Sequence, residues 1–188
     1  MKNPAKEKYK RNPSWSDIKK AIAGYDRAAL VGLISDLYAS SALNKTFLHA
    51  RFSTGEDALK PYLKIIEDAL YPDVYKNKPV QIAKAKKAIS DYTKAAGEPV
   101  GILDLMLTFV ETGTEFTVNF GDIDEGFYLA LERMYYKALQ LVRTMDKSTI
   151  VDFYDRFEDL VTSTRNIGWG YHDALEEMFR SAFPEDED

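Results

Sequence analysis

The sequence predicts an all-α protein of stacked antiparallel helical hairpins, arranged as an irregular helical bundle or as a short α-solenoid-like repeat. Apolar residues recur at helical spacing through most of the 188 residues, and short turn-forming stretches separate these segments. Only residues 116–120 alternate in the manner of a strand. Because no second strand candidate could pair with them, we expect a helix end or a loop there, although an extended conformation also fits the pattern.

The most apolar stretch, residues 100–110, predicts a central helix. Its polar residues and those just after it form one narrow stripe on a helical wheel: Asp104, Thr108, Glu111 and Glu115. Such a helix needs neighbours on two or three sides, and it is shorter than the ~20 apolar residues that span a bilayer. We therefore expect its neighbours to be protein, with Leu105 and Met106 fully buried.

Capping residues mark the starts of the N-terminal helices. Ser14 and Asp17 have the spacing of a capping box, and Gly24 ends the helix that they begin. Asp26 is a good N-cap for the next helix, and Asn44 is expected to cap a short helix after it. The helix after Asp26 carries a stripe of apolar residues: Leu30, Leu33, Ile34 and Leu37. The short helix is expected to turn three residues inward: Phe47, Leu48 and Phe52.

Proline and glycine delimit the helices in the middle of the chain. A second capping box begins at Ser53, and the helix that follows is expected to be kinked at Pro61 or to begin there. Pro79 is at the first helical position of another helix, which Gly97 closes, and Pro99 opens the central helix.

Two long amphipathic helices and one shorter helix complete the expected fold. Residues 127–145 form the first, and Asp146 caps the second, which is expected to end at Gly168. A glycine-flanked aromatic corner at residues 169–173 leads into the last helix.

The length fits a single helical domain, residues 1–188, with a flexible basic arm at residues 1–13 and a short acidic tail at residues 184–188. The absence of Cys rules out disulfides and thiolate ligands, and it fits a reducing compartment. No apolar run follows the basic arm, so we expect neither a secretory signal nor a membrane anchor. These features predict a cytoplasmic protein with no membrane partner.

The sequence offers no convincing catalytic, cofactor-binding or metal-binding residues. It lacks a glycine-rich phosphate loop and a nucleophile elbow, and its two His leave few general bases. An EF-hand that began at Asp122 would need Gly at the position of Phe127 and Glu at the position of Arg133. His172 and Glu176 have the spacing of two ligands on one helix face, but no third His or Cys is near. We therefore expect no catalytic residue, no cofactor and no metal.

Two groups of residues are candidate contacts with a partner. The glycines beside Trp169 let the backbone turn sharply and leave aromatic rings near the surface. Alternatively, Trp169 folds back over Phe157 and Val161 to cap the core, with Gly168 as a left-handed helix stop. The second group combines cations and His at a helix end, as an anion site or as a polar rim. The candidate residues are Trp169, Tyr171, His172, Lys45, His49 and Arg51.

One predicted helix has a basic face that a polyanion could contact: Lys84, Lys87 and Lys94. Against nucleic-acid binding, base readout relies on Arg, Asn and Gln, and this helix offers only Gln81. The net charge of −5 would also repel a phosphate backbone.

The segment from Asp26 to Phe52 includes Leu-Tyr-Ala-Ser-Ser and Asn-Lys-Thr-Phe-Leu-His-Ala-Arg-Phe, and residues 83–92 read Ala-Lys-Ala-Lys-Lys-Ala-Ile-Ser-Asp-Tyr. With these motifs the chain resembles a family of small uncharacterised bacterial proteins, most strongly over residues 26–96. The resemblance implies an all-helical fold with helical-repeat character. It brings no activity and no catalytic residues.

A non-enzymatic protein-interaction or adaptor domain is therefore the leading functional hypothesis, because the unusual residues lie on helix faces and corners. One alternative is a nucleic-acid-associated protein that uses the basic helix. Another is a small hydrolase-like enzyme with scattered carboxylates. The expected partner is a protein, and the oligomeric state is left open.

Overall fold

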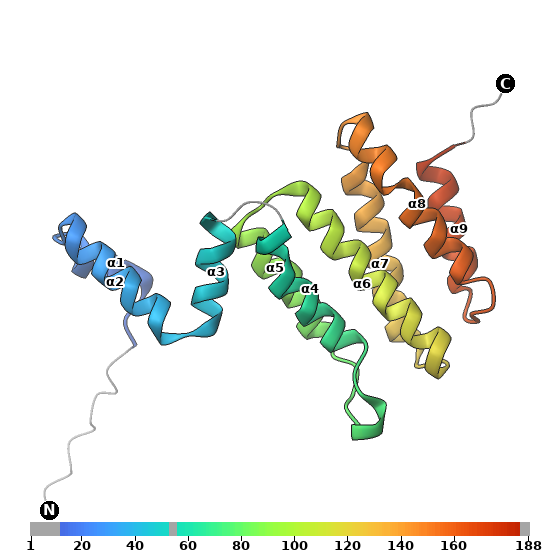
Figure 1. Cartoon of the computed structure of the whole chain (residues 1–188), viewed down its shortest axis with the longest axis horizontal. Helices are drawn as coiled ribbons and strands as arrows, with labels where there is room; N and C mark the ends of the chain where they lie inside the picture. Colours follow the sequence, from blue (N-terminus) through green and yellow to red (C-terminus); the bar gives the residue numbers. More distant parts are fainter. Residues whose placement is uncertain (1–11, 53–55, 185–188) are drawn as a thin grey trace, which may run out of the picture. The chain divides into compact units, whose positions relative to one another are not determined.

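The computed structural model describes residues 12–52 and 56–184, and within them it contains α-helices, one 3-10 turn and no strand (Figure 1). The predicted all-α fold is confirmed, and residues 116–120 are the last turn and a half of a helix. The helices are α1 (Trp15–Ile22), α2 (Arg27–Ser40), α3 (Ala42–Phe52), α4 (Glu56–Leu70), α5 (Ile82–Ala95), α6 (Pro99–Phe120), α7 (Glu125–Val142), α8 (Lys147–Ser163) and α9 (Tyr171–Ala182), with η1 (Val74–Lys76) between α4 and α5.

The chain divides into two compact units, Met1–Lys45 and Thr46–Asp188, and the division falls inside α3. Most of the predicted basic arm and acidic tail lies outside the described residues, as does the start of the capping box at Ser53. The single-domain organisation stays a prediction.

In the second unit, helices α4 to α9 pack as three hairpins side by side (Figure 1). Helix α4 packs with α5, α6 with α7, and α8 with α9. Helix α6 also contacts α4, α5 and α8, while α9 contacts α7, so the middle hairpin joins the two outer ones. The predicted stack of helical hairpins is therefore present in this unit.

Helix α6 is the centre of this stack. Half of its 22 residues are buried, and Leu105, Leu107 and Phe109 have no exposed surface. Full burial is confirmed for Leu105 and wrong for Met106, which packs against the core but stays partly exposed. The row of Ile102 and Met106 lies opposite the polar stripe on the helix, and the neighbouring helices cover neither row completely.

Glycine permits the closest approach between α6 and α7. A Cβ atom on Gly113 would lie 2.5 Å from Cδ2 of Leu131, whose side chain is fully buried. Any side chain at this position would therefore push the two helices apart or displace the Leu131 side chain.

Most of the predicted helix starts are confirmed. Ser14 and Asp17 form a reciprocal capping box, and the carboxylates of Asp26 and Asp146 accept hydrogen bonds from backbone N–H groups of the first turns of α2 and α8. Helix α4 begins before Pro61 and continues through it.

Three predicted boundaries are wrong, and a contact with the preceding helix accompanies two of them. Asn44 lies inside α3, where its side-chain amide donates to the Leu37 carbonyl oxygen of α2 at 2.7 Å. Pro79 precedes α5, whose N-cap is Gln81, and the Gln81 N–H donates to Ala69 in α4 at 2.8 Å. Helix α8 ends at Ser163, well before Gly168.

The core position of α6 gives a stability prediction. We expect Leu105→Ala to lower the free energy of unfolding by ~2–5 kcal/mol, because a fully buried Leu leaves a cavity. Urea unfolding followed by helical circular dichroism measures this loss. Val118→Ala is the control, since Val118 is on the same helix but 57% exposed, and it should change stability by less than ~1 kcal/mol. Equal effects of the two changes would contradict the central role of α6.

Candidate functional site

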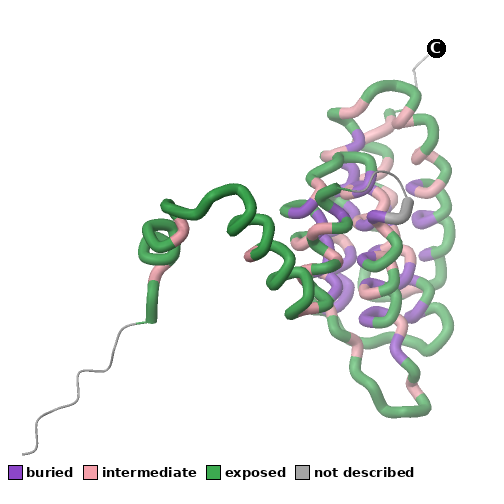
Figure 2. Tube along the Cα trace, turned by 60° about the vertical axis from the view of Figure 1, so that its left-hand side comes forward, coloured by how far each residue is buried: buried purple, intermediate pink, exposed green. Residues whose placement is uncertain are grey.

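The N-terminal helices expose an unusual number of large apolar side chains. Neither α1 nor α2 contains a buried residue, and Figure 2 shows the described N-terminal segment almost wholly as exposed or intermediate. The exposed large side chains among residues 12–45 are Trp15, Ile18, Tyr25, Leu30, Val31, Ile34, Leu37, Tyr38 and Leu43. Every pair of described helices that packs along its length lies within α4–α9.

Helix α2 has one face of large apolar side chains and an opposite face of small side chains. One face, here called the Leu face, consists of Leu30, Leu33, Ile34 and Leu37. The opposite small face consists of Ala28, Gly32, Ser35 and Ala39. An apolar helix face of this kind is normally buried, yet Ile34 and Leu37 are each 49% exposed.

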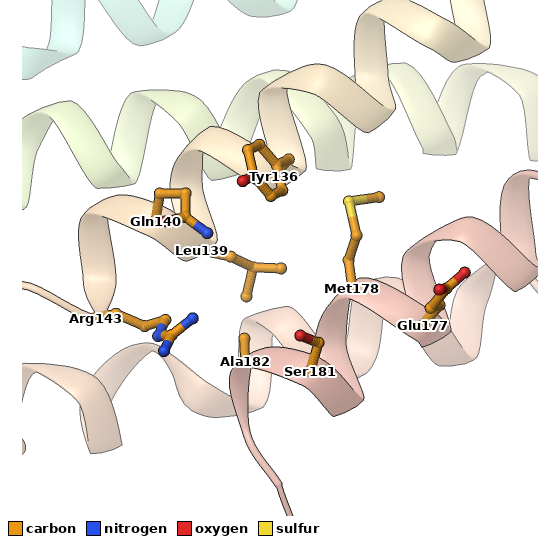
Figure 3. A pocket seen from close by; sticks show the side chains of 8 residues that line it. All are labelled: Tyr136, Leu139, Gln140, Arg143, Glu177, Met178, Ser181 and Ala182. Carbon is orange, nitrogen blue, oxygen red and sulfur yellow. The ribbon is translucent and has the colours of Figure 1, made fainter.

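A small hollow of about 160 Å³ lies between α7 and α9 (Figure 3). Its apolar wall is formed by Leu139, Met178 and Ala182, and the polar ends of Arg143 and Gln140 lie at one side of it. Sites for small-molecule ligands usually measure ~300–1,000 Å³. The hollow therefore fits one side chain of a partner better than a substrate.

The polar stripe of α6 is occupied by one cation, Arg156 of α8. Its guanidinium donates to both carboxylate oxygens of Glu111, at 2.7 Å each, and to Oδ1 of Asp104 at 2.7 Å. Burial lowers the pKa of Arg156, but the hydrogen bonds and charges of Glu111 and Asp104 outweigh burial and raise it. Arg156 therefore joins both carboxylates in one ion-pair network between α6 and α8.

The sequence missed Arg156 as a partner of this stripe. It showed that Asp104 and Glu111 share one face of a helix, but Arg156 is 45 residues after Glu111. No local spacing links positions that far apart.

The aromatic corner before α9 separates into one exposed ring and one buried ring. Trp169 is 61% exposed and stacks on Tyr128, with ring centroids 6.5 Å apart. The expectation that Trp169 covers Phe157 and Val161 is therefore wrong. The left-handed residues are Trp169 and Gly170, which corrects the assignment of that role to Gly168.

Tyr171 is fully buried, and its hydroxyl is 2.8 Å from Oγ1 of Thr114. Its proposal as a partner contact is corrected, because the side chain joins α9 to the centre of α6. The sequence spacing could not show that one of these rings is exposed and the other buried, although both rings pack against Tyr128. Trp169 is the member of the corner with an accessible ring.

His172 and Glu176 do not form a metal site. Nδ1 of His172 lies 3.0 Å from Oγ1 of Thr164 and 3.2 Å from the Val161 carbonyl oxygen, while Glu176 pairs with Arg180 at 2.8 Å. Across the described ranges, no group of three or more His, Cys, Asp or Glu residues has the arrangement of a metal site.

The cations of α3 have separate roles in the two units. The Lys45 ammonium lies 5.4 Å from the centre of the Tyr38 ring. Arg51 donates to the Lys94 carbonyl oxygen at 2.6 Å and lies over the Phe47 ring, and His49 is exposed. Their role in anion binding stays a prediction.

The expected inward orientation of α3 side chains is wrong for two residues. Phe47 is 39% exposed and Phe52 is 81% exposed, whereas Ala50 is the buried residue of this helix. Aromatic size alone therefore misidentified the buried face, because the residue of α3 that belongs to the core is the small Ala50.

On the predicted basic helix, now α5, Lys84, Lys87 and Lys94 are all exposed. The Lys87 ammonium pairs with the Asp91 carboxylate one turn later, which neutralises part of the basic face. Binding of a polyanion to this face stays a prediction.

None of the helices in the described ranges is both long enough and apolar enough to cross a membrane. Comparisons of the chain with protein-family models, with curated proteins and with solved structures found no match. The resemblance to a bacterial family stays a prediction. The class that the fold defines is an all-α protein of stacked helical hairpins with an exposed apolar N-terminal segment.

Three buried tyrosines predict a loss of stability at alkaline pH. Burial raises the pKa of Tyr128, with help from its hydrogen bond to Asp122, to about 12, and burial also raises the pKa values of Tyr135 and Tyr171. An unfolded tyrosine has a pKa of about 10, so the folded state holds these protons more tightly. Their contribution to stability is complete below pH ~10 and is lost as the pH rises through the folded pKa values.

Urea unfolding at increasing pH above neutrality, with tyrosinate absorbance recorded on the same samples, measures this effect. Tyr135→Phe should reduce the alkaline loss of stability. The matched Tyr75→Phe, at a ring that is 92% exposed, should leave it unchanged. Complete ionisation of all tyrosines near pH ~10 in a protein that is still folded would contradict the prediction.

The corner predicts two very different mutational effects. Trp169→Ala should cost no more than ~1.5 kcal/mol of unfolding free energy, the upper range for an aromatic pair, because most of its ring is in solvent. Tyr171→Ala should cost ~3–5 kcal/mol, as buried aromatic truncations do. Urea unfolding of both variants measures the difference, and a loss of ~3 kcal/mol or more for Trp169→Ala would restore its role as a core cap.

Proposed function

We propose that this protein is a non-enzymatic protein-interaction domain whose contact element is the N-terminal helix pair α1 and α2. The observation that carries the proposal is the exposure of α2, which has large apolar side chains along one face and no buried residue. Adaptor function, a protein partner and a cytoplasmic location are parts of this proposal. The cysteine-free sequence supports the location.

The energetic argument is the cost of leaving these side chains in water. Burial of one large apolar side chain is worth ~1.5–3 kcal/mol. At ~200 Å² for each large side chain, the exposed fractions from Trp15 to Leu43 amount to roughly 900 Å². This is about the area that one partner contributes to a standard protein interface. A partner that covered α1 and α2 would therefore have enough apolar surface to bind stably.

Features of the second unit support a role without catalysis. Arg156 forms salt bridges with Asp104 and Glu111, two carboxylates of the polar stripe of α6. No described contact favours nucleic-acid binding or hydrolysis over protein interaction.

The test introduces charge on the exposed apolar helix. We expect Leu30→Lys combined with Ile34→Lys to abolish capture of specific partners from native cell extract, because a partner would have to bury two lysines. Captured proteins are identified by quantitative mass spectrometry, and the thermal midpoint of the second unit should be unchanged. The matched control is Val151→Lys combined with Val118→Lys, at side chains that are 71% and 57% exposed on α8 and α6.

The control should retain the same partners as the parent protein. If the α2 variant and the control capture identical sets of proteins, α2 is not the contact element. If only the control loses partners, the contact surface belongs to the second unit and the proposal is overturned.

A further inference from the structure

We propose that one partner of this surface is a second copy of the chain, which binds through antiparallel pairing of the Leu faces of two α2 helices. This inference rests on the proposed role of α2 as a contact element. It adds the identity of the occupant, the orientation of the two helices and the residues at the symmetry axis.

The Leu face is self-complementary about the midpoint of α2. The helix spans Arg27–Ser40, so its midpoint lies between Leu33 and Ile34, and Leu30 and Leu37 are equally far from it. A twofold axis at this midpoint places Leu30 of one copy level with Leu37 of the other, and Leu33 level with Ile34. Such an isologous contact pairs large aliphatic side chains at every level of the interface.

The small face has the same symmetry about the midpoint, so symmetry alone does not decide which face forms the interface. Ala28 and Ala39, like Gly32 and Ser35, are equidistant from the midpoint. A Cβ atom added to Gly32 would meet no atom within 4 Å, so nothing inside the chain requires glycine there. The Leu face removes much more apolar surface from water than the small face would, and it is therefore the better interface.

Charge favours the antiparallel orientation over the parallel one. The charged residues of α2 are Arg27 in its first turn and Asp36 in its third, so the helix is neutral overall. Antiparallel pairing sets Arg27 beside the negative C-terminal end of the other helix, whereas parallel pairing sets the two Arg27 side chains together. The helix dipoles also oppose one another favourably in this orientation.

Charge outside α2 predicts an unusual dependence on salt. Residues 1–45 carry nine Lys and Arg against four Asp and Glu, so two copies of this unit repel one another. Salt screens this repulsion and leaves apolar burial intact. Dimerisation should therefore strengthen as salt is added, whereas binding of a polyanion to the same basic unit would weaken.

The natural absence of cysteine permits a direct geometric test in the full-length protein. Ile34 is less than one residue rise from the proposed axis, so Ile34→Cys should form a disulfide with its own copy under mild oxidation. The positions of Leu30 in the two copies would be ~10 Å apart along the axis, because seven residues at 1.5 Å separate Leu30 from Leu37. Leu30→Cys and Leu37→Cys should therefore each fail to crosslink alone, and a mixture of the two should crosslink.

Non-reducing electrophoresis identifies the covalent dimers, and sedimentation equilibrium of the unmodified chain at low and high salt gives its mass without any substitution. We expect a reversible dimer that salt strengthens. Gly32→Ala on the small face should keep the dimer, and Leu30→Lys combined with Ile34→Lys should give monomer with the helical spectrum of the second unit unchanged.

A monomeric parent protein at all concentrations and salt levels would overturn the second-copy proposal, as would crosslinking of Leu30→Cys and Leu37→Cys each to itself but not to one another. If the parent is monomeric while the α2 charge variant still loses captured proteins, the interaction role stands with a different protein as partner. If neither mass nor capture responds to α2, both proposals fail.

Discussion

Enclosure of helix α6 is the constraint on which the rest of the second unit depends. The helix is apolar around most of its circumference, and burying half of its residues requires neighbours in several directions. Helices α4, α5, α7 and α8 supply these neighbours, and α9 completes the stack through α7. Three hairpins side by side satisfy this need with short connections, because each hairpin brings its own apolar faces to the next.

The polar groups that enter this core are matched to partners. Arg156 meets the carboxylates of Asp104 and Glu111, and Tyr171 meets Thr114, so α8 and α9 are each tied to α6 by a polar contact as well as by packing. Among the described residues that are not exposed, no buried side-chain nitrogen or oxygen lacks a hydrogen-bond partner. The paired polar groups of this core stabilise the fold. The proposed function is therefore placed at the surface of the protein.

Helices α6 and α2 show how the same kind of sequence can have opposite outcomes. Both are rich in aliphatic residues, yet α6 has 11 buried residues and α2 has none. The hydrophobic effect favours burial of the apolar side chains of both helices, and of the two only α6 has buried residues. The proposed interaction role of α2 follows from this difference, and it would place the missing contacts in another protein molecule.

The sequence by itself determined the features that depend on neighbours within one or two helical turns. Periodicity identified the helices and the acidic stripe of α6, and side-chain chemistry identified the caps at Ser14, Asp26 and Asp146. Only the tertiary structure decided which side chains are buried or paired: Arg156 pairs with the stripe, Tyr171 is buried while Trp169 is exposed, and α2 has no buried residue. Those outcomes depend on residues that are tens of positions apart in the sequence. The packing of whole helices brings such residues together, and the periodicity of the sequence does not predict that packing.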